Sequence, residues 1–169
     1  LGTITHFLLN HKAQDIEYMN EMNFLSHEQV LAIATAYGTP VFVYDQASLE
    51  ATADAVMRFP NAFGLTARYA MKALPTAAVL QTLTARGLHI DASSGFEAER
   101  AMIAGVDPTH IQITAQEIPK DLKGLVEQGV QYNACSLHQL RAYGELFPGS
   151  EVAVRINPGL GSGHNNRNN

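Results

Sequence analysis

Short apolar segments of strand-like composition recur about every 21 residues through most of this chain, and that spacing constrains its fold more than any other feature. The segments are Thr66–Ala70, Leu88–Asp91, Ile111–Thr114, Val130–Ala134 and Val152–Ile156. Each interval has room for one strand, one helix and two short loops. Strands joined in this way are expected to be parallel, with right-handed crossovers. The sequence therefore predicts an α/β protein with a parallel sheet.

The stretches between these segments have helical spacing. Residues 78–85 and 98–104 place apolar side chains on one face at the 3.6-residue period of a helix. Gly87 and Gly105 follow the two stretches and are expected to cap the C-terminal ends of the helices. One further apolar segment, Val41–Tyr44, precedes the series and is predicted to be a strand.

Two architectures satisfy this alternation, a doubly wound open sheet and a (β/α)8 barrel. No glycine-rich dinucleotide-binding turn follows the first strand of the series, because residues 68–74 read RYAMKAL. We therefore predict a barrel. A closed barrel has eight strands and typically about 250 residues. The chain has 169 residues, so we expect it to contain an incomplete TIM barrel.

We expect three segments along the chain. Residues 1–21 are interpreted as a leader or a non-native extension, because they lack the continuous apolar core of a secretory signal. Residues 22–45 are expected to form an N-terminal helix and strand, and residues 46–169 to form the incomplete barrel. All apolar runs are far shorter than the roughly 20 residues that cross a bilayer, so no membrane partner is expected.

The charge and cysteine content narrow the functional classes. The chain has 16 acidic and 11 basic residues and a formal net charge of −5. Its basic residues do not cluster, so a nucleic-acid partner is not expected. The single cysteine, Cys135, excludes an internal disulfide framework and favours the reducing cytoplasm.

Polar side chains follow the predicted strands where each strand ends. In barrels of parallel strands, the carboxyl ends of the strands form one rim, and active groups lie there. The residues concerned are Lys72, Asp91, Ser93, Thr114–Gln116, Asn133, Arg155, Asn157 and His164. Such a gathering on one rim of an otherwise apolar sheet indicates an enzyme.

Lys72 has two interpretations on these grounds alone. It lies between Tyr69-Ala70-Met71 and Ala73-Leu74, in apolar company at a strand end. A lysine in that position can extend its ammonium group to solvent and have no chemical role. Alternatively, it can be a Schiff-base lysine, whose amine must lose its proton and benefits from partial desolvation.

Four motifs resemble one family. Residues 69–73 (YAMKA) resemble the Y-A-x-K-A segment at which the alanine-racemase-like barrel decarboxylases bind pyridoxal phosphate. Residues 91–97 (DASSGFE) are similar to that family's D-x-x-S-x-x-E segment, and residues 155–159 (RINPG) to its R-x-N-P-G strand end. Residues 161–164 (GSGH) are similar to the glycine-flanked histidine of the diaminopimelate decarboxylases. The resemblance covers residues 37–169 and favours the Schiff-base interpretation of Lys72.

The resemblance implies a role for each matching residue. Lys72 would be the catalytic residue and would hold pyridoxal 5'-phosphate covalently. His164 would lie over one face of the cofactor ring, and Asp91 would lie near the lysine and influence its charge. Arg155, at the end of a buried strand, would need an acidic or cofactor-linked partner. Glu97 is a weaker candidate for a place near the site. No metal site is expected.

The resemblance also implies the reaction. The expected activity is decarboxylation of meso-diaminopimelate to L-lysine, in lysine biosynthesis, by a homodimer when full length. Later strands and a second, β-rich domain would supply the remaining site residues, so we expect the 169-residue chain alone to be inactive and poorly soluble. Three alternatives stay open. One is another barrel decarboxylase, for ornithine, arginine or carboxynorspermidine, and another is a non-catalytic pyridoxal-phosphate-binding barrel protein. The third is a non-enzymatic barrel whose motif matches are coincidental.

Overall fold

A computed structural model describes residues 24–158, and its chain falls into two compact units that divide between Asp45 and Gln46. In the first unit, helix α3 spans His27–Tyr37. Ser26 begins this helix with a reciprocal capping box: its hydroxyl accepts from the Gln29 amide at 3.2 Å, and the Gln29 side chain accepts from the Ser26 amide at 2.8 Å. Gly38 ends the helix with φ of 77°.

The predicted strand at Val41–Tyr44 is wrong for the described structure. The segment forms neither helix nor strand, and all four of its side chains are exposed. A strand requires a hydrogen-bonded neighbour, and within residues 24–158 no other segment pairs with this one. The residues 1–21 that we expected to be a leader or extension lie outside the described residues.

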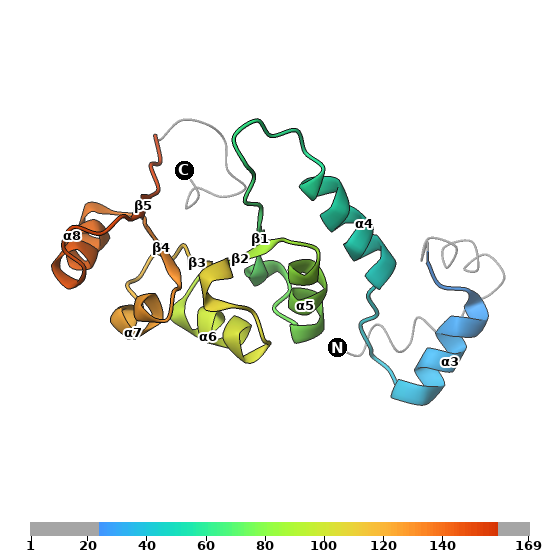
Figure 1. Cartoon of the computed structure of the whole chain (residues 1–169). Helices are drawn as coiled ribbons and strands as arrows, with labels where there is room; N and C mark the ends of the chain where they lie inside the picture. Colours follow the sequence, from blue (N-terminus) through green and yellow to red (C-terminus); the bar gives the residue numbers. More distant parts are fainter. Residues whose placement is uncertain (1–23, 159–169) are drawn as a thin grey trace. The chain divides into compact units, whose positions relative to one another are not determined.

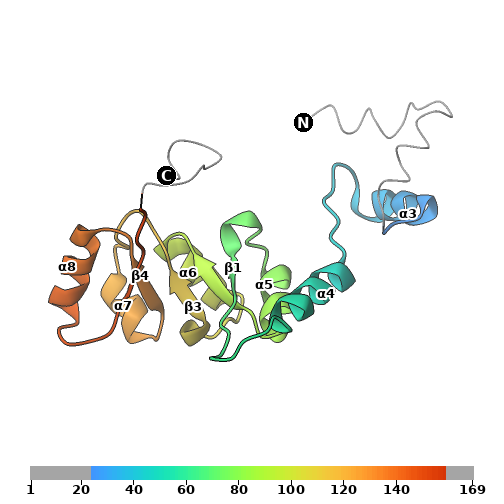
Figure 2. The ribbon, with the colours of Figure 1, turned by 90° about the horizontal axis from the view of Figure 1, so that it is seen from above.

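The second unit alternates helices and strands (Figures 1 and 2). After helix α4 (Gln46–Met57), its elements are β1 (Arg68–Ala70), the 3-10 turn η2 (Met71–Ala73), α5 (Ala77–Ala85), β2 (His89–Ala92), α6 (Gly95–Ile103), the 3-10 turn η3 (Pro108–His110), β3 (Ile111–Ile113), α7 (Leu122–Glu127), β4 (Gln131–Ala134), α8 (Leu137–Leu146) and β5 (Ala153–Val154). The strands fall within the five predicted segments, except that β2 ends one residue later, at Ala92.

All strands of the sheet are parallel and follow one another in chain order, β1-β2-β3-β4-β5. A doubly wound sheet reverses its strand order at a switch point, whereas a barrel does not. The order therefore confirms the prediction of a partial α/β barrel. The described residues contribute five strands to it, against eight in a closed barrel.

The strands bury alternate side chains. Ile90, Ile111 and Ile113 are fully buried, together with Ala92 and Ala134, and they pack against the helices that follow one another along the sheet. The side chains between them, on the opposite face, are polar and only partly buried, among them Asp91, Gln112 and Asn133. Because side chains alternate across a strand, one face of the sheet forms the core and the other carries polar groups.

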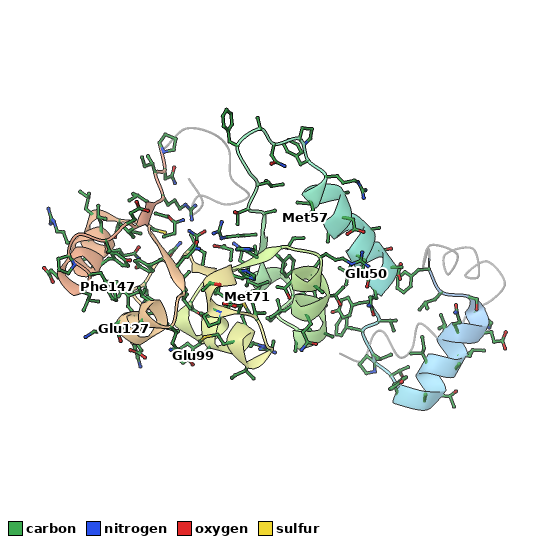
Figure 3. All side chains as sticks on the ribbon, viewed as in Figure 1. Glu50, Met57, Met71, Glu99, Glu127 and Phe147 are labelled. Atoms are coloured by element: carbon green, nitrogen blue, oxygen red, sulfur yellow. The ribbon has the colours of Figure 1, made fainter. Side chains whose placement is uncertain are left out.

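Helix α4 joins this unit through a second, smaller apolar cluster. Ala53 is buried there against Val79, Leu83 and Leu88. Glu50, which points toward α5 in Figure 3, and Asp54 both form ion pairs with Arg86 at the end of α5. Helix α4 is thus held by an apolar contact and by a charged one.

The turn from α5 to β2 shows why a glycine is required there. Gly87 has φ of 90°, in the left-handed region, and an added Cβ would lie 3.3 Å from the Met57 Cε atom of α4. Gly105 has φ of 89° after α6. Both glycines follow their helices as predicted, and the Gly105 amide bonds back to the Met102 carbonyl at 2.9 Å.

Within the described residues, no helix is long and apolar enough to cross a membrane.

Candidate active site

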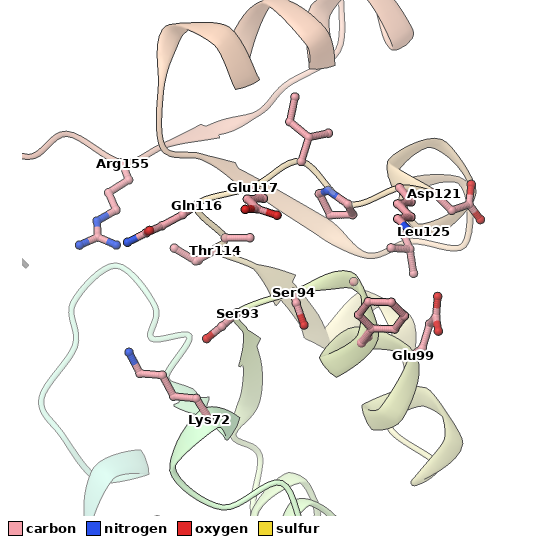
Figure 4. Close-up of a pocket in the computed structure, with 16 residues that line it drawn as sticks. Lys72, Ser93, Ser94, Glu99, Thr114, Gln116, Glu117, Asp121, Leu125 and Arg155 are labelled. Carbon is pink, nitrogen blue, oxygen red and sulfur yellow. The ribbon is translucent and has the colours of Figure 1, made fainter. Parts of the chain in front are cut away.

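The carboxyl ends of the strands surround an open cavity of about 850 Å³ (Figure 4). The turn after β1 contributes Lys72, and the segment after β2 contributes Ser93 and Ser94. The segment after β3 contributes residues 114–121, and Arg155 follows β5. The cavity therefore lies on the rim where the sequence predicted an active site. Among residues 24–158, no group of three His, Cys, Asp or Glu side chains is arranged to hold a metal.

Lys72 owes its position to the residues beside it. Met71 is fully buried and lies at the centre of the unit in Figure 3, so its side chain anchors the η2 turn in the core. The Tyr69 hydroxyl donates to the Leu74 carbonyl at 3.4 Å and spans the same turn. With its neighbour fixed in this way, the exposed Lys72 side chain extends into the cavity toward Ser93 (Figure 4).

Asp91 is not among the residues that line the cavity, but it is bonded to one that is. Its Oδ1 atom accepts a hydrogen bond from the Thr114 hydroxyl at 2.6 Å, and Thr114 lines the cavity. The Asn133 Nδ2 atom donates to the same hydroxyl oxygen at 3.3 Å. Three polar residues, from β2, from the residue after β3 and from β4, are therefore linked by consecutive hydrogen bonds. The sequence predicted that all three lie on one rim but did not predict the link.

The turn after β2 is held by a side chain of α6. The Glu97 Oε2 atom accepts from the Ser93 amide at 2.7 Å, and the Ser94 hydroxyl accepts from the Glu97 amide at 3.2 Å. This arrangement fixes two serines that line the cavity and also caps α6. Glu97 thus lies near the cavity, which was the expectation for this weaker candidate. Its side chain stabilises the turn after β2.

The turn after β4 repeats this arrangement with different side chains. The Gln139 Oε1 atom accepts from the Cys135 amide at 2.6 Å, and the Ser136 hydroxyl accepts from the Gln139 amide at 3.2 Å. Residues 91–97 (DASSGFE) and residues 133–139 (NACSLHQ) therefore share one pattern of strand end, serine cap and acceptor.

Gln139 also reaches the neighbouring segment. Its Nε2 atom donates to the Ala115 carbonyl at 3.0 Å and to the Gln116 carbonyl at 2.9 Å, and the side chain is 1% exposed. Helix α8 thereby holds the cavity-lining segment after β3. Sequence reasoning missed this residue, although the spacing of Ser136 and Gln139 is the signal of a capping box.

Arg155 reaches the cavity at the other end of the sheet. Its amide donates to the Ala134 carbonyl at 2.8 Å, which continues the pairing of β5 with β4. Its guanidinium lies near the Gln116 side chain in Figure 4. Within residues 24–158 no acidic side chain forms an ion pair with it, so of the two partners expected for Arg155 the acidic one is not among these residues. His164, the fourth predicted site residue, lies outside the described residues.

The cavity also has acidic groups that the sequence did not single out. Glu99 of α6, Glu117 and Asp121 line it, and Figure 4 shows Glu99 and Asp121 at the end away from Lys72. No sequence pattern marked them, because exposed acids on helices and loops are common. Lys72 and Arg155 thus lie at one end of the cavity, and the carboxylates of Glu99 and Asp121 lie at the other, which we call the acidic end. Lys120, which precedes Asp121 in the chain, also lines the cavity.

Comparison with known proteins identifies the family. The chain matches the family described as pyridoxal-dependent decarboxylase, pyridoxal binding domain, over residues 49–169. The chain belongs to this family. The resemblance drawn from the four motifs is thereby confirmed at the level of the family.

Individual relatives carry decarboxylase names. The chain is 37% identical over 150 residues to a protein named diaminopimelate decarboxylase from Streptomyces coelicolor, covering 86% of this chain and 33% of the relative. It resembles a crystal structure of diaminopimelate decarboxylase at a TM-score of 0.73 and 32% identity, covering 83% of this chain and 33% of that one. It also resembles the lysine decarboxylase of Selenomonas ruminantium at a TM-score of 0.65 and 26% identity, covering 82% and 38%. The chain therefore spans about a third of the length of these relatives.

The residues of the cavity fit the cofactor that the family name implies. An aldehyde cofactor needs a primary amine, and Lys72 presents one. A phosphate or carboxylate group needs cations and hydroxyl donors, and Arg155, Ser93 and Ser94 are such groups among the residues that line the cavity.

Proposed function

We propose that the complete gene product carrying this sequence decarboxylates meso-diaminopimelate to L-lysine with pyridoxal 5'-phosphate, as a step of lysine biosynthesis. The observation that carries the proposal is the position of Lys72, a primary amine that extends into an open rim cavity in a member of the pyridoxal-dependent decarboxylase family. The name of the relative at 37% identity supports diaminopimelate as the substrate.

Each predicted site residue has a chemical part in this proposal. Lys72 would hold the cofactor covalently through its amine, which condenses with an aldehyde group with loss of water. When bound, pyridoxal phosphate supplies an acceptor for the electron pair that remains when the α-carboxylate leaves. Arg155 binds an anionic group of the cofactor or substrate. Asp91 places a carboxylate behind the wall that bears Lys72, and His164 is proposed to cover the cofactor ring.

The acidic end of the cavity supports a substrate with a second amino group. Glu99 and Asp121 lie at the end away from Lys72, where carboxylates would attract a distant ammonium group (Figure 4). Diaminopimelate, lysine and ornithine all carry such a group. This feature and the likeness to the Selenomonas ruminantium lysine decarboxylase favour a diamine-type amino-acid substrate as the second candidate. A barrel protein that binds the cofactor without turnover remains the third reading of the sequence.

The assembly and location belong to the same proposal. We propose a homodimer in the cytoplasm, since the resemblance implies a dimer and the single cysteine is compatible with a reducing compartment. Size-exclusion chromatography with light scattering tests the dimer: a monomer at micromolar concentration would contradict it.

Covalent cofactor binding tests the central claim. The complete gene product is incubated with pyridoxal phosphate, reduced with borohydride and digested, and mass spectrometry locates the modified lysine. We expect the label on Lys72 and its loss in Lys72→Ala. Lys123→Ala is the matched control, because Lys123 is an exposed lysine of α7 that pairs with Glu127. A label that persists in Lys72→Ala would overturn the proposal.

Carbon dioxide release then tests the substrate. Meso-diaminopimelate, lysine and ornithine are supplied in turn to the loaded protein. Release from diaminopimelate alone is the expected result. Release from lysine or ornithine instead would move the assignment to the second candidate, and labelling of Lys72 without any release would favour the non-catalytic protein.

A further inference from the structure

The two hydrogen bonds that link Asn133, Thr114 and Asp91 have a fixed order of donor and acceptor. The Asn133 Nδ2 atom is a donor, so the Thr114 oxygen must accept from it at 3.3 Å. The Thr114 hydroxyl then has its own proton to donate, and it donates to Asp91 Oδ1 at 2.6 Å. The Asn133 amide therefore orients the hydroxyl, and the oriented hydroxyl holds the carboxylate. All three residues are partly buried, which limits competition from water.

The pairing of β1 with β2 places these three hydrogen-bonded residues near the turn that carries Lys72. Asp91 is paired in register with Ala70, the last residue of β1, and β2 packs against the η2 turn that carries Lys72. Thr114 lines the cavity that Lys72 enters, whereas Asp91 does not. The Thr114 amide donates to the Ala92 carbonyl at 2.8 Å, which fixes its backbone against the strand of Asp91. The hydroxyl thus lies between the cavity and the carboxylate.

From this geometry we infer that Thr114 is a positioning residue of the cofactor site: its hydroxyl, oriented by Asn133, holds the Asp91 carboxylate beside the turn of Lys72. The inference rests on the proposed function, because it assumes that Lys72 binds the cofactor. A fixed carboxylate near a protonated imine nitrogen stabilises the positive charge there. Removing the hydroxyl frees the carboxylate to rotate, and the positive charge loses that stabilisation.

The test follows the absorbance of the lysine-bound cofactor as a function of pH in the complete gene product. Thr114→Val keeps the shape of the side chain and removes the hydroxyl, and Thr114→Ser keeps the hydroxyl. We expect the pH midpoint of the absorbance change to move toward acid by about one unit in Thr114→Val, and to stay near that of the unmodified protein in Thr114→Ser. Thr82→Val is the matched control, since the Thr82 hydroxyl bonds only within helix α5.

Two results would overturn the inference. One is an unchanged midpoint in Thr114→Val. The other is an equal shift in Thr114→Ser, which would assign the effect to packing rather than to the hydroxyl. If Thr114→Val does not fold, Asn133→Leu decides. That change removes the donor that orients the hydroxyl and adds no charge, so an unchanged midpoint in Asn133→Leu also overturns the inference.

The proposed function fails in a different way. If the unmodified protein forms no absorbance band with pyridoxal phosphate, and borohydride leaves Lys72 unlabelled, cofactor binding itself is absent. A normal band and label in the unmodified protein, together with unmoved midpoints in the variants, would leave the proposed function standing and remove only the role of Thr114.

Discussion

His89 is the first residue of β2 and lies at the amino ends of the strands, whereas the cavity lies at their carboxyl ends. Its surroundings disfavour protonation of the imidazole. Its ring stacks on His110 with the centroids 4.1 Å apart and the planes 29° apart. Its Nδ1 atom is buried and has no hydrogen-bond partner among the described residues. Burial lowers the pKa of His89, and the nearby His110 and Arg68 lower it further, because each disfavours a second positive charge.

The lowered pKa predicts that acid destabilises the fold through His89. In the unfolded chain this imidazole takes up a proton near pH 6.5, whereas in the folded chain it resists protonation. The contribution to stability is therefore complete above about pH 6.5 and is lost as the pH falls below it. We expect the free energy of unfolding, measured by urea denaturation, to fall less steeply between about pH 6.5 and pH 5 in His89→Phe than in the unmodified protein. His138→Phe, at an exposed position of α8, should keep the original slope. Parallel curves for His89→Phe and the unmodified protein would contradict this account.

Several site residues were predictable one by one, and their contacts were not. Lys72, Asp91 and Arg155 could be named because each lies in a short motif at the end of a strand or just after it. The hydrogen bond from Thr114 to Asp91 depends on the register of β3 against β2. The sequence of either strand alone does not determine that register. Contacts between side chains on different strands therefore had to come from the structure.

At the scale of the elements, Gln139 is the residue whose loss should matter most. Its side chain joins three backbone groups: the amide of Cys135 and the carbonyls of Ala115 and Gln116. Gln139→Leu removes all three partners at a buried site, and we expect a loss of at least about 2 kcal/mol in the free energy of unfolding. Urea denaturation of the complete gene product measures it.

The matched control is Gln128→Leu. The Gln128 side chain bonds a carbonyl of its own helix, α7, in an exposed position. A surface change of this kind should alter the free energy of unfolding by no more than about 0.5 kcal/mol. If Gln139→Leu were as mild as Gln128→Leu, the three bonds of Gln139 would not stabilise the segment after β3.

Alternation of strand and helix predicted the strands of this chain better than apolar composition alone did. The period of strand and helix was sufficient to locate β1 to β5, and β2, β3 and β4 each pack against a neighbouring helix. Val41–Tyr44 had the same apolar composition but neither a covering helix nor a partner strand among the described residues. Composition indicates that a segment can be extended, and only pairing makes it a strand.

At the scale of the whole molecule, β5 is one of the two edges of the described sheet, and β1 is the other. Strand β5 pairs with β4, and no other strand in residues 24–158 covers its far side. Val154 is 51% exposed there. An apolar edge strand offers unpaired backbone groups to other copies of the chain, and this favours aggregation.

We therefore expect a lysine on this edge to increase the soluble yield of the 169-residue chain expressed alone. Val154→Lys should reduce the aggregate seen by light scattering, since a charged edge resists pairing. Leu137→Lys removes a still more exposed apolar side chain, 71% against 51% for Val154, from helix α8 and serves as the control. Equal improvement by both changes would show that general surface polarity, rather than the edge, governs solubility.

The hydrogen bonds of Gln139 to the segment after β3 have a consequence for how related proteins diverge in sequence. Helix α8 belongs to the outer layer, yet its glutamine holds the backbone of Ala115 and Gln116 at the cavity. A substitution that shifts this helix by a fraction of its pitch would move the cavity wall with it. Homologues that share every catalytic side chain would then differ in ligand preference through changes on their outer helices.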